Sequence, residues 1–115
     1  MHFGLSEEQD MIVSTVRSFV ENEIYPHEDL VERTGAVPGE IAQEIKRRTL
    51  ELGFYACNFP ESVGCAGLNH MEFALVEREL GRGSMALNHF FGRPQNILMA
   101  CEGEQIERYL LPAVR

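Results

Sequence analysis

The sequence predicts an all-α fold, a single bundle of five helices. Apolar residues recur at steps of three and four in successive segments, which is the spacing of amphipathic helices, and no segment of useful length shows the alternation of a strand. Short connections join these segments, as in a helix bundle. The 115 residues, 44% of them hydrophobic, are enough for one domain with one core, so we take residues 1–115 as one domain.

The first helix is expected over residues 6–24. Ser6 is followed three residues later by Gln9, the pattern of a capping box, in which each side chain satisfies a backbone amide of the first turn. One apolar stripe then runs along the segment and consists of Ile12, Val13, Val16, Phe19, Val20 and Ile24. Because Pro26 has no backbone donor, we expect the helix to end before it.

The second helix is expected to run from Pro38 or Gly39 to Leu52, after a polar connection over residues 26–38. Gly53 fits its C-cap, where a positive φ favours glycine. The apolar face should consist of Ile41, Ile45 and Leu52. Three adjacent basic residues could hold an anion, but we expect them to form a solvated face: Lys46, Arg47 and Arg48.

The second half of the chain is expected to be helical after an ordered loop over residues 54–67. Helices should cover residues 69–80, 84–91 and 104–111, with a further helical piece over residues 97–100. Ser84 can cap the fourth helix, Gly92 and Pro94 must break it, and Pro112 should end the last one. On the third helix, the residues expected to face solvent are Glu72, Glu77, Arg78 and Glu79.

The charge balance and the cysteines limit the classes of function. Lys and Arg number 10 against 18 Asp and Glu, a formal net charge of −8, which disfavours nucleic-acid binding and binding of a basic helix to a membrane surface. The N-terminus lacks the pattern of a targeting segment and no run suits a membrane span, so we expect a cytoplasmic or otherwise reducing compartment. An odd number of cysteines without a CxxC pair predicts structural thiols rather than disulfides or a zinc site: Cys57, Cys65 and Cys101.

The ionisable residues form no recognisable catalytic motif. The histidines, at positions 2, 27, 70 and 89, lack the spacing of a helical metal pair, and Ser84 has no nucleophile elbow around it. The exception is that Asn88, His89 and Gly92 interrupt an apolar helix close to a proline. Buried polar groups need partners and a glycine opens space, so this segment could form a pocket wall. The alternative is a hydrogen-bonded core histidine beside a simple kink.

Five short motifs, in order along the whole chain, resemble the amino-terminal helical domain of acyl-CoA dehydrogenases. They are Leu5-Ser6-Glu7-Glu8-Gln9, Leu52-Gly53-Phe54, Pro60-Glu61-Ser62-Val63-Gly64-Cys65-Ala66-Gly67, Glu77-Arg78-Glu79-Leu80-Gly81, and Glu104-Gln105 followed by Tyr109-Leu110-Leu111-Pro112. The resemblance implies an oxidoreductase, a flavoprotein of fatty acid metabolism whose central β domain and carboxy-terminal helical bundle hold FAD and the catalytic Glu. This chain would then be a piece of such an enzyme, inactive alone, without catalytic, cofactor-binding or metal-binding residues of its own.

The resemblance also implies partners and a site. The partners would be an acyl-CoA substrate, an electron-transfer flavoprotein or oxygen as electron acceptor, and further copies of the enzyme in a homo-oligomer. The helix after the Glu79-Leu80-Gly81 turn faces the acyl chain in the family, and the matching positions are Asn88, His89, Phe91 and Gly92. A histidine there would favour a polar or bulky acyl group.

Three departures from the family pattern leave relatives open. Cys65 and Cys101 stand where the family commonly has glycine, which would strain the backbone if either position needs a positive φ. The segment from Gly92 to Asn96 is a few residues shorter than in straight-chain enzymes. Flavin monooxygenases, acyl-CoA oxidases and nitroalkane oxidases share the architecture, and a free-standing helical binding module without chemistry is the alternative outside this family.

Overall fold

The computed structural model describes residues 3–115, and none of these residues lies in a strand. This confirms the predicted all-α fold; residues 1 and 2, including His2, lie outside the described part. The elements in order are α1 (Glu7–Phe19), η1 (Val20–Ile24), α2 (Tyr25–Thr34), α3 (Gly39–Leu52), η2 (Glu61–Val63), α4 (His70–Leu80), α5 (Met85–Asn88), η3 (His89–Phe91), η4 (Asn96–Ala100), η5 (Ile106–Leu110) and α6 (Leu111–Val114).

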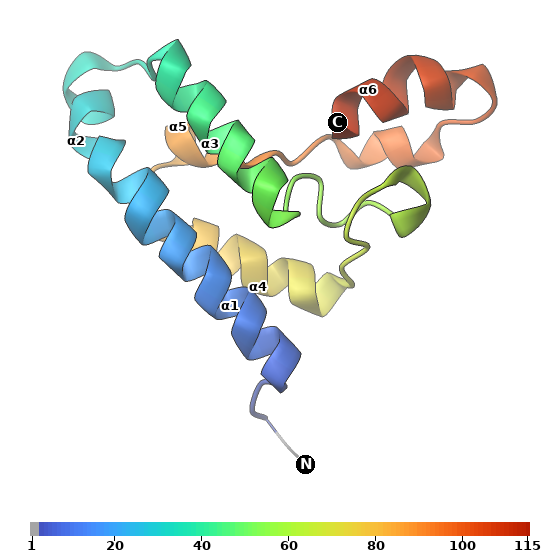
Figure 1. Ribbon diagram of the computed structural model, residues 1–115, viewed down its shortest axis with the longest axis horizontal. Helices are drawn as coiled ribbons and strands as arrows, with labels where there is room; N and C mark the ends of the chain where they lie inside the picture. The colour runs from blue at the N-terminus through green and yellow to red at the C-terminus, as the bar shows by residue number, and fades with distance from the viewer. Residues whose placement is uncertain (1–2) are drawn as a thin grey trace.

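The first helical segment begins as predicted but does not end at Pro26. Ser6 and Gln9 form the complete capping box, and the predicted apolar stripe is buried or partly buried. The expected polar connection is wrong for residues 26–34, because α2 follows directly (Figure 1). The π turn η1 separates α1 from α2, which places Pro26 in the first turn of a new helix, where its missing N–H is not needed.

The same arrangement recurs at the C-terminus. The π turn η5 precedes α6, and Pro112 lies in the first turn of α6 rather than ending the helix. The prediction that the helix stops near Pro112 was therefore wrong for the same physical reason as at Pro26.

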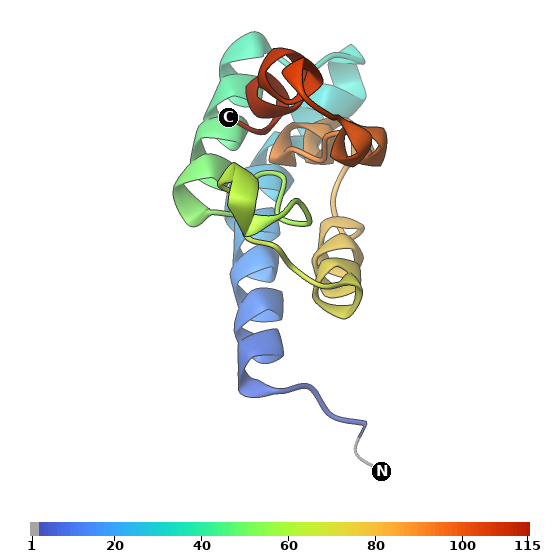
Figure 2. The ribbon, with the colours of Figure 1, turned by 90° about the vertical axis from the view of Figure 1, so that its right-hand side faces the viewer.

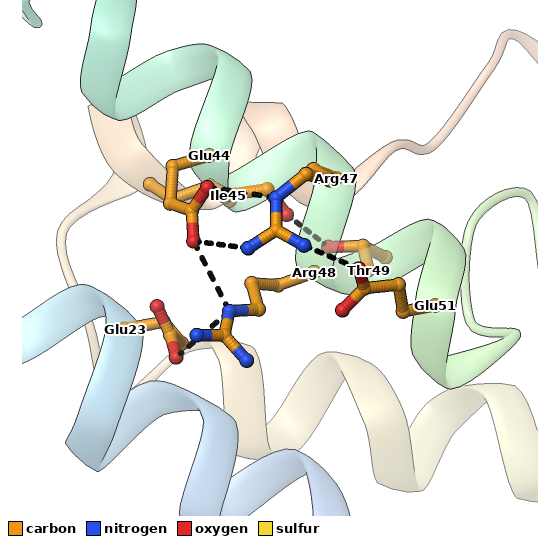
Figure 3. Close-up of polar contacts among 7 residues, drawn as sticks. All are labelled: Glu23, Glu44, Ile45, Arg47, Arg48, Thr49 and Glu51. Atoms are coloured by element: carbon orange, nitrogen blue, oxygen red, sulfur yellow. Dashed lines mark hydrogen bonds and ion pairs between the residues drawn. The ribbon is translucent and has the colours of Figure 1, made fainter.

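Helix α3 and the ion pairs along it agree with most of the prediction. Gly53 caps the helix with φ +78°, and the three basic residues are exposed. Figure 3 shows that Arg47 hydrogen-bonds Glu44 and Glu51, while Arg48 bonds Glu44 and pairs with Glu23. One expected member of the apolar face, Leu52, is exposed. Thr49 is buried in its place, its hydroxyl donating to the Ile45 carbonyl at 2.9 Å.

The fourth predicted helix covers the expected residues but is not α-helical throughout. It comprises only α5 and one 3-10 turn, η3, before Gly92 reverses the backbone with φ +94°. The Ser84 side chain does not cap α5; the Ser84 amide instead donates to Glu28 Oε1 of α2 at 2.7 Å. The helical piece beyond the break is also a 3-10 helix, η4.

Two apolar clusters hold the elements together. The larger one joins α1, η1, α2, α3, α4, α5 and η3, and α1 and α4 lie side by side (Figures 1 and 2). The smaller one lies under the C-terminal segments and contains Ala56, Phe59, Leu110 and Val114. The molecule measures 45 × 44 × 21 Å, so it is a flat slab with two broad faces.

Asn69 provides a test of local helix capping. Its side chain accepts from the Glu72 amide at 2.8 Å, and Glu72 reaches back to the Asn69 amide at 3.0 Å. We expect Asn69→Ala to lower the free energy of unfolding by about 1 kcal/mol because the first turn of α4 loses an acceptor. Ser84→Ala is the matched control, since the Ser84 side chain makes no capping bond, and should have almost no effect in urea unfolding. Equal losses for both variants would contradict this account.

Candidate functional site

A groove of about 470 Å³ lies between α4, the turn η3 and the segment that follows Gly92. Its lining residues are Asn58, Phe73, Glu77, His89, Arg93, Pro94, Gln95 and Asn96. A second hollow of about 370 Å³ shares Asn58, Phe73 and Asn96 with it, so the two form one extended surface depression. We take this groove as the candidate site because it contains His89 and several groups able to form hydrogen bonds.

The four residues selected from the sequence have different environments. His89 is exposed and lines the groove, so the alternative of a buried core histidine does not apply. Asn88 is only 4% exposed, and its amide nitrogen donates to the carbonyls of Leu80 and Gly83. Phe91 is 1% exposed and packs edge-to-face on Phe19, with ring centroids 5.2 Å apart.

Gly92 is buried where the backbone passes closely over an aromatic ring. A Cβ at this position would lie 2.1 Å from Cδ2 of Tyr55, and φ is +94°. The Gly92 carbonyl accepts from the Ala56 amide at 2.9 Å, which ties the groove segment to the loop after α3. Only glycine satisfies both the dihedral angle and the close approach, so Gly92 directs the chain into the groove wall.

Sequence reasoning missed the polar pairs that shape this groove. Arg93 donates to Glu77 Oε2 at 2.5 Å, and Asn58 donates to Asn96 Oδ1 at 2.9 Å. Two acceptor atoms of the groove lining, Glu77 Oε1 and Asn58 Oδ1, are buried without a hydrogen-bond donor, as is Oδ1 of Asn88. One signal in the sequence could have pointed to Arg93 as a groove residue: it stands between Gly92 and Pro94, two residues that turn the chain.

The most buried carboxylate lies outside the groove. Glu79, expected to face solvent, is completely buried and accepts hydrogen bonds from Arg17, Arg78 and Arg82 at 2.6 to 3.1 Å. These bonds, with that of Arg17 the largest cause, lower the pKa of Glu79 to about 2. The carboxylate is saturated with donors, so we assign it a structural role that joins α1 to α4. The helical periodicity of α4 predicted that Glu79 faces solvent. That prediction was wrong, because hydrogen bonds from three arginines compensate the cost of burying the carboxylate.

Cys57, Cys65 and Cys101 are free thiols. Burial raises the pKa of Cys57 to about 12, and burial also raises the pKa of Cys65. Neither Cys65 nor Cys101 has a positive φ, so the strain anticipated at these positions does not arise. Within residues 3–115 no three side chains of His, Cys, Asp or Glu gather as metal ligands would.

The comparisons with known proteins agree with this architecture. A family model described as "Acyl-CoA dehydrogenase, N-terminal domain" matches residues 6–115. The chain belongs to the acyl-CoA dehydrogenase family. The family match confirms the resemblance seen in the sequence motifs, and it covers every element of the structure. No solved structure gives a significant match.

Three curated members of the family show how much of them this domain covers. Benzylmalonyl-CoA dehydrogenase of Aromatoleum aromaticum is 38% identical over 87 residues, covering 76% of this chain and 22% of that protein. 3-(Aryl)acrylate reductase of Clostridium sporogenes is 28% identical over 115 residues, covering 96% and 29%. The CarC subunit of the caffeyl-CoA reductase–Etf complex of Acetobacterium woodii is 31% identical, covering 95% and 29%. The acyl-CoA dehydrogenase domain described here thus spans less than a third of these relatives.

The family implies FAD, and two hollows of the described residues do not suit its pyrophosphate. One of about 590 Å³ beside α2 is lined by three carboxylates, Glu28, Asp29 and Glu32, against one guanidinium, Arg82. The other, of about 430 Å³ between α1 and α3, contains Glu23 and Glu51 against Arg48. The excess of negative charge in both would repel a diphosphate. No helix of the described residues has both the length and the apolar character needed to cross a bilayer.

Proposed function

We propose that this domain supplies one wall of the acyl pocket in a flavin-dependent acyl-CoA dehydrogenase, an enzyme that performs α,β-dehydrogenation of an acyl-CoA thioester. The family match over residues 6–115 supports the enzyme class. The groove that contains His89 is the observation that carries the assignment of the wall. It is concave, and it lies on the segment that the motif order equates with the acyl-facing helix of the family.

The four predicted site residues take distinct roles in this proposal. His89 lies beside the acyl group, while Asn88, Phe91 and Gly92 act from beneath the surface. The Asn88 amide holds the Leu80–Gly83 turn, Phe91 anchors η3 in the core, and Gly92 sets the direction of the groove wall. The wall is therefore held rigid from behind, which favours selection among acyl groups.

The acyl group is proposed to be polar or bulky rather than a plain fatty chain. The groove presents amide, imidazole, carboxylate and guanidinium groups, and an alkyl chain would remove these groups from water without forming a hydrogen bond to any of them. The names of the relatives benzylmalonyl-CoA dehydrogenase and caffeyl-CoA reductase indicate aromatic acyl groups. A relative that belongs to an Etf complex supports an electron-transfer flavoprotein as the acceptor.

The remaining chemistry is assigned to other parts of the enzyme. We propose that FAD, the catalytic base and most contacts between copies of a homo-oligomer lie outside this domain, which alone would not turn over substrate. FAD, when bound, supplies the acceptor for the β-hydride. Mixing the 115-residue chain with FAD and 3-phenylpropionyl-CoA should leave the flavin absorbance unchanged. Bleaching by this chain alone would contradict the division of labour.

Binding to the wall can be measured on the chain directly. In an ¹⁵N-labelled sample, 3-phenylpropionyl-CoA is expected to shift the amide signals around His89, Arg93 and Asn96, with a Kd of about 1 mM for a half-pocket. CoA alone, which lacks the acyl group, should not shift them. His89→Leu should change the order of affinities between phenylpropionyl-CoA and octanoyl-CoA. Shifts confined to another face, or an unchanged order in His89→Leu, would refute the proposal.

A further inference from the structure

The groove combines apolar surface with two buried acceptor atoms that receive no hydrogen bond. Phe73 and Pro94 provide the apolar surface of the groove. Its polar groups include the carboxylate of Glu77 and the amides of Asn58 and Asn96. A flat ring fits beside such a surface, because aromatic and proline surfaces bury apolar area without flexible side chains. The polar groups then determine which substituent the ring carries.

Glu77 is the polar group with an unmet requirement. Its Oε2 accepts from Arg93 at 2.5 Å, but its Oε1 is buried and receives no hydrogen bond. A carboxylate oxygen can only accept, so a reassignment of atoms cannot satisfy it. Burying an acceptor without a donor is unfavourable, so a ligand that brings an O–H or N–H group is favoured at this point.

The local charge selects the kind of donor. Glu77 and Arg93 neutralise each other, and the remaining lining residues with amide groups carry no charge. A ligand carboxylate would approach Glu77 as a like charge, whereas a neutral hydroxyl donates to it and can also accept from a neighbouring N–H. The Glu77 side chain is 35% exposed and lines the groove. Because the terminal torsion of glutamate is broad, a small turn of the carboxylate can bring Oε1 toward a ligand hydroxyl while Oε2 keeps its bond to Arg93.

We propose that the groove binds an acyl group that ends in a hydroxylated ring, with the ring on Phe73 and Pro94 and the hydroxyl group donating to Oε1 of Glu77. This inference rests on the proposed function and adds the class of substrate to it. Asn58, whose Oδ1 is also buried without a donor, provides a second acceptor on the same wall. Glu77 is thus the residue that determines specificity.

The test compares three CoA thioesters on the unaltered 115-residue chain by ¹⁵N chemical shifts and calorimetry. They are 3-(4-hydroxyphenyl)propionyl-CoA, 3-phenylpropionyl-CoA and 3-(4-carboxyphenyl)propionyl-CoA. The hydroxyl compound should bind about tenfold more tightly than the unsubstituted one, the effect of one hydrogen bond to a charged acceptor. The carboxyl compound should bind more weakly than both.

Glu77→Gln keeps the shape of the side chain and removes its charge. It should reduce the tenfold preference to about twofold, because a neutral acceptor binds a hydroxyl less strongly. Glu107→Gln, an exposed carboxylate of η5 outside the groove, is the matched control and should retain the preference.

The possible outcomes separate this inference from the proposed function. Equal affinity for the hydroxyl and unsubstituted compounds, with shifts in the groove, overturns the hydroxylated ring and leaves the acyl-pocket wall standing. A preference that survives in Glu77→Gln overturns the role of Glu77. No groove shift with any thioester overturns the wall itself and the inference with it. The comparison of ligands on the unaltered chain decides the substrate class even if Glu77→Gln fails to fold.

Discussion

Glu79→Ala is expected to lower the free energy of unfolding by about 3 kcal/mol, because it leaves three arginines around a buried position without their shared carboxylate. Glu79 is fully buried and joins Arg17 of α1 to two further arginines. Arg78 lies in α4, and Arg82 lies just after the end of α4. Loss of the carboxylate also removes the polar link between the two helices that pack most extensively. Urea unfolding followed by circular dichroism measures the change.

Glu44→Gln is the matched control for this prediction. Arg47 and Arg48 lower the pKa of Glu44 to about 2 as well, yet Glu44 lies on the solvated side of α3. Exposed ion pairs contribute little to stability, so this variant should unfold close to the unaltered chain. Comparable losses for Glu79→Ala and Glu44→Gln would show that burial of Glu79 is not the source of the effect.

The same carboxylate predicts a dependence on pH. The pKa of Glu79 falls from its usual value of 4.5 to about 2 on folding, so its contribution is complete above pH 4.5 and is lost as the pH falls toward 2. The stability of Glu79→Gln should therefore decline less steeply over this range than that of the unaltered chain. Parallel declines would contradict the assignment.

Gly92→Ala is expected to lower the free energy of unfolding by about 3 kcal/mol through two effects, a strained dihedral angle and a clash. The added Cβ would lie 2.1 to 2.2 Å from the ring carbons Cδ2 and Cε2 of Tyr55, and φ is +94°. The ring cannot yield freely, because Tyr55 packs in the smaller apolar cluster and lies under the ammonium of Lys46. Thermal unfolding reports the loss.

Gly53→Ala separates the two effects at Gly92. Gly53 also has a positive φ, +78°, but nothing lies within 4 Å of its added Cβ. This variant should lose only about 1 kcal/mol, the effect of the dihedral angle alone. The groove signals of Gly92→Ala should also move, whereas those of Gly53→Ala should not, because only Gly92 adjoins the groove wall. An equal loss in both variants would exclude the clash with Tyr55.

Local features of the chain were predictable where they depend on neighbours within one helical turn. The capping box at Ser6, the apolar stripe of α1 and the C-cap at Gly53 were all confirmed. The two prolines were misread because a π turn is not visible in the periodicity, and a proline directly after one begins a helix instead of ending it.

The candidate site was predictable only in its position along the chain. The mixture of polar and small residues near Pro94 located the groove segment, and the structure places His89 in it. Asn88 and Phe91 belong to the same segment but are buried beneath it. A helix of one turn followed by a 3-10 turn has no long-range periodicity, so which of its residues face outward could not be inferred.

The sequence by itself determined most of the helices, the caps at Ser6 and Gly53, the family and the position of the candidate groove segment, since each depends on short-range patterns or ordered motifs. The tertiary structure decided which side chains meet. Glu77 and Arg93 are 16 residues apart, Asn58 and Asn96 are 38 apart, and Glu79 and Arg17 are 62 apart. These contacts arise from the packing of separate segments around a shared core, which no local pattern encodes.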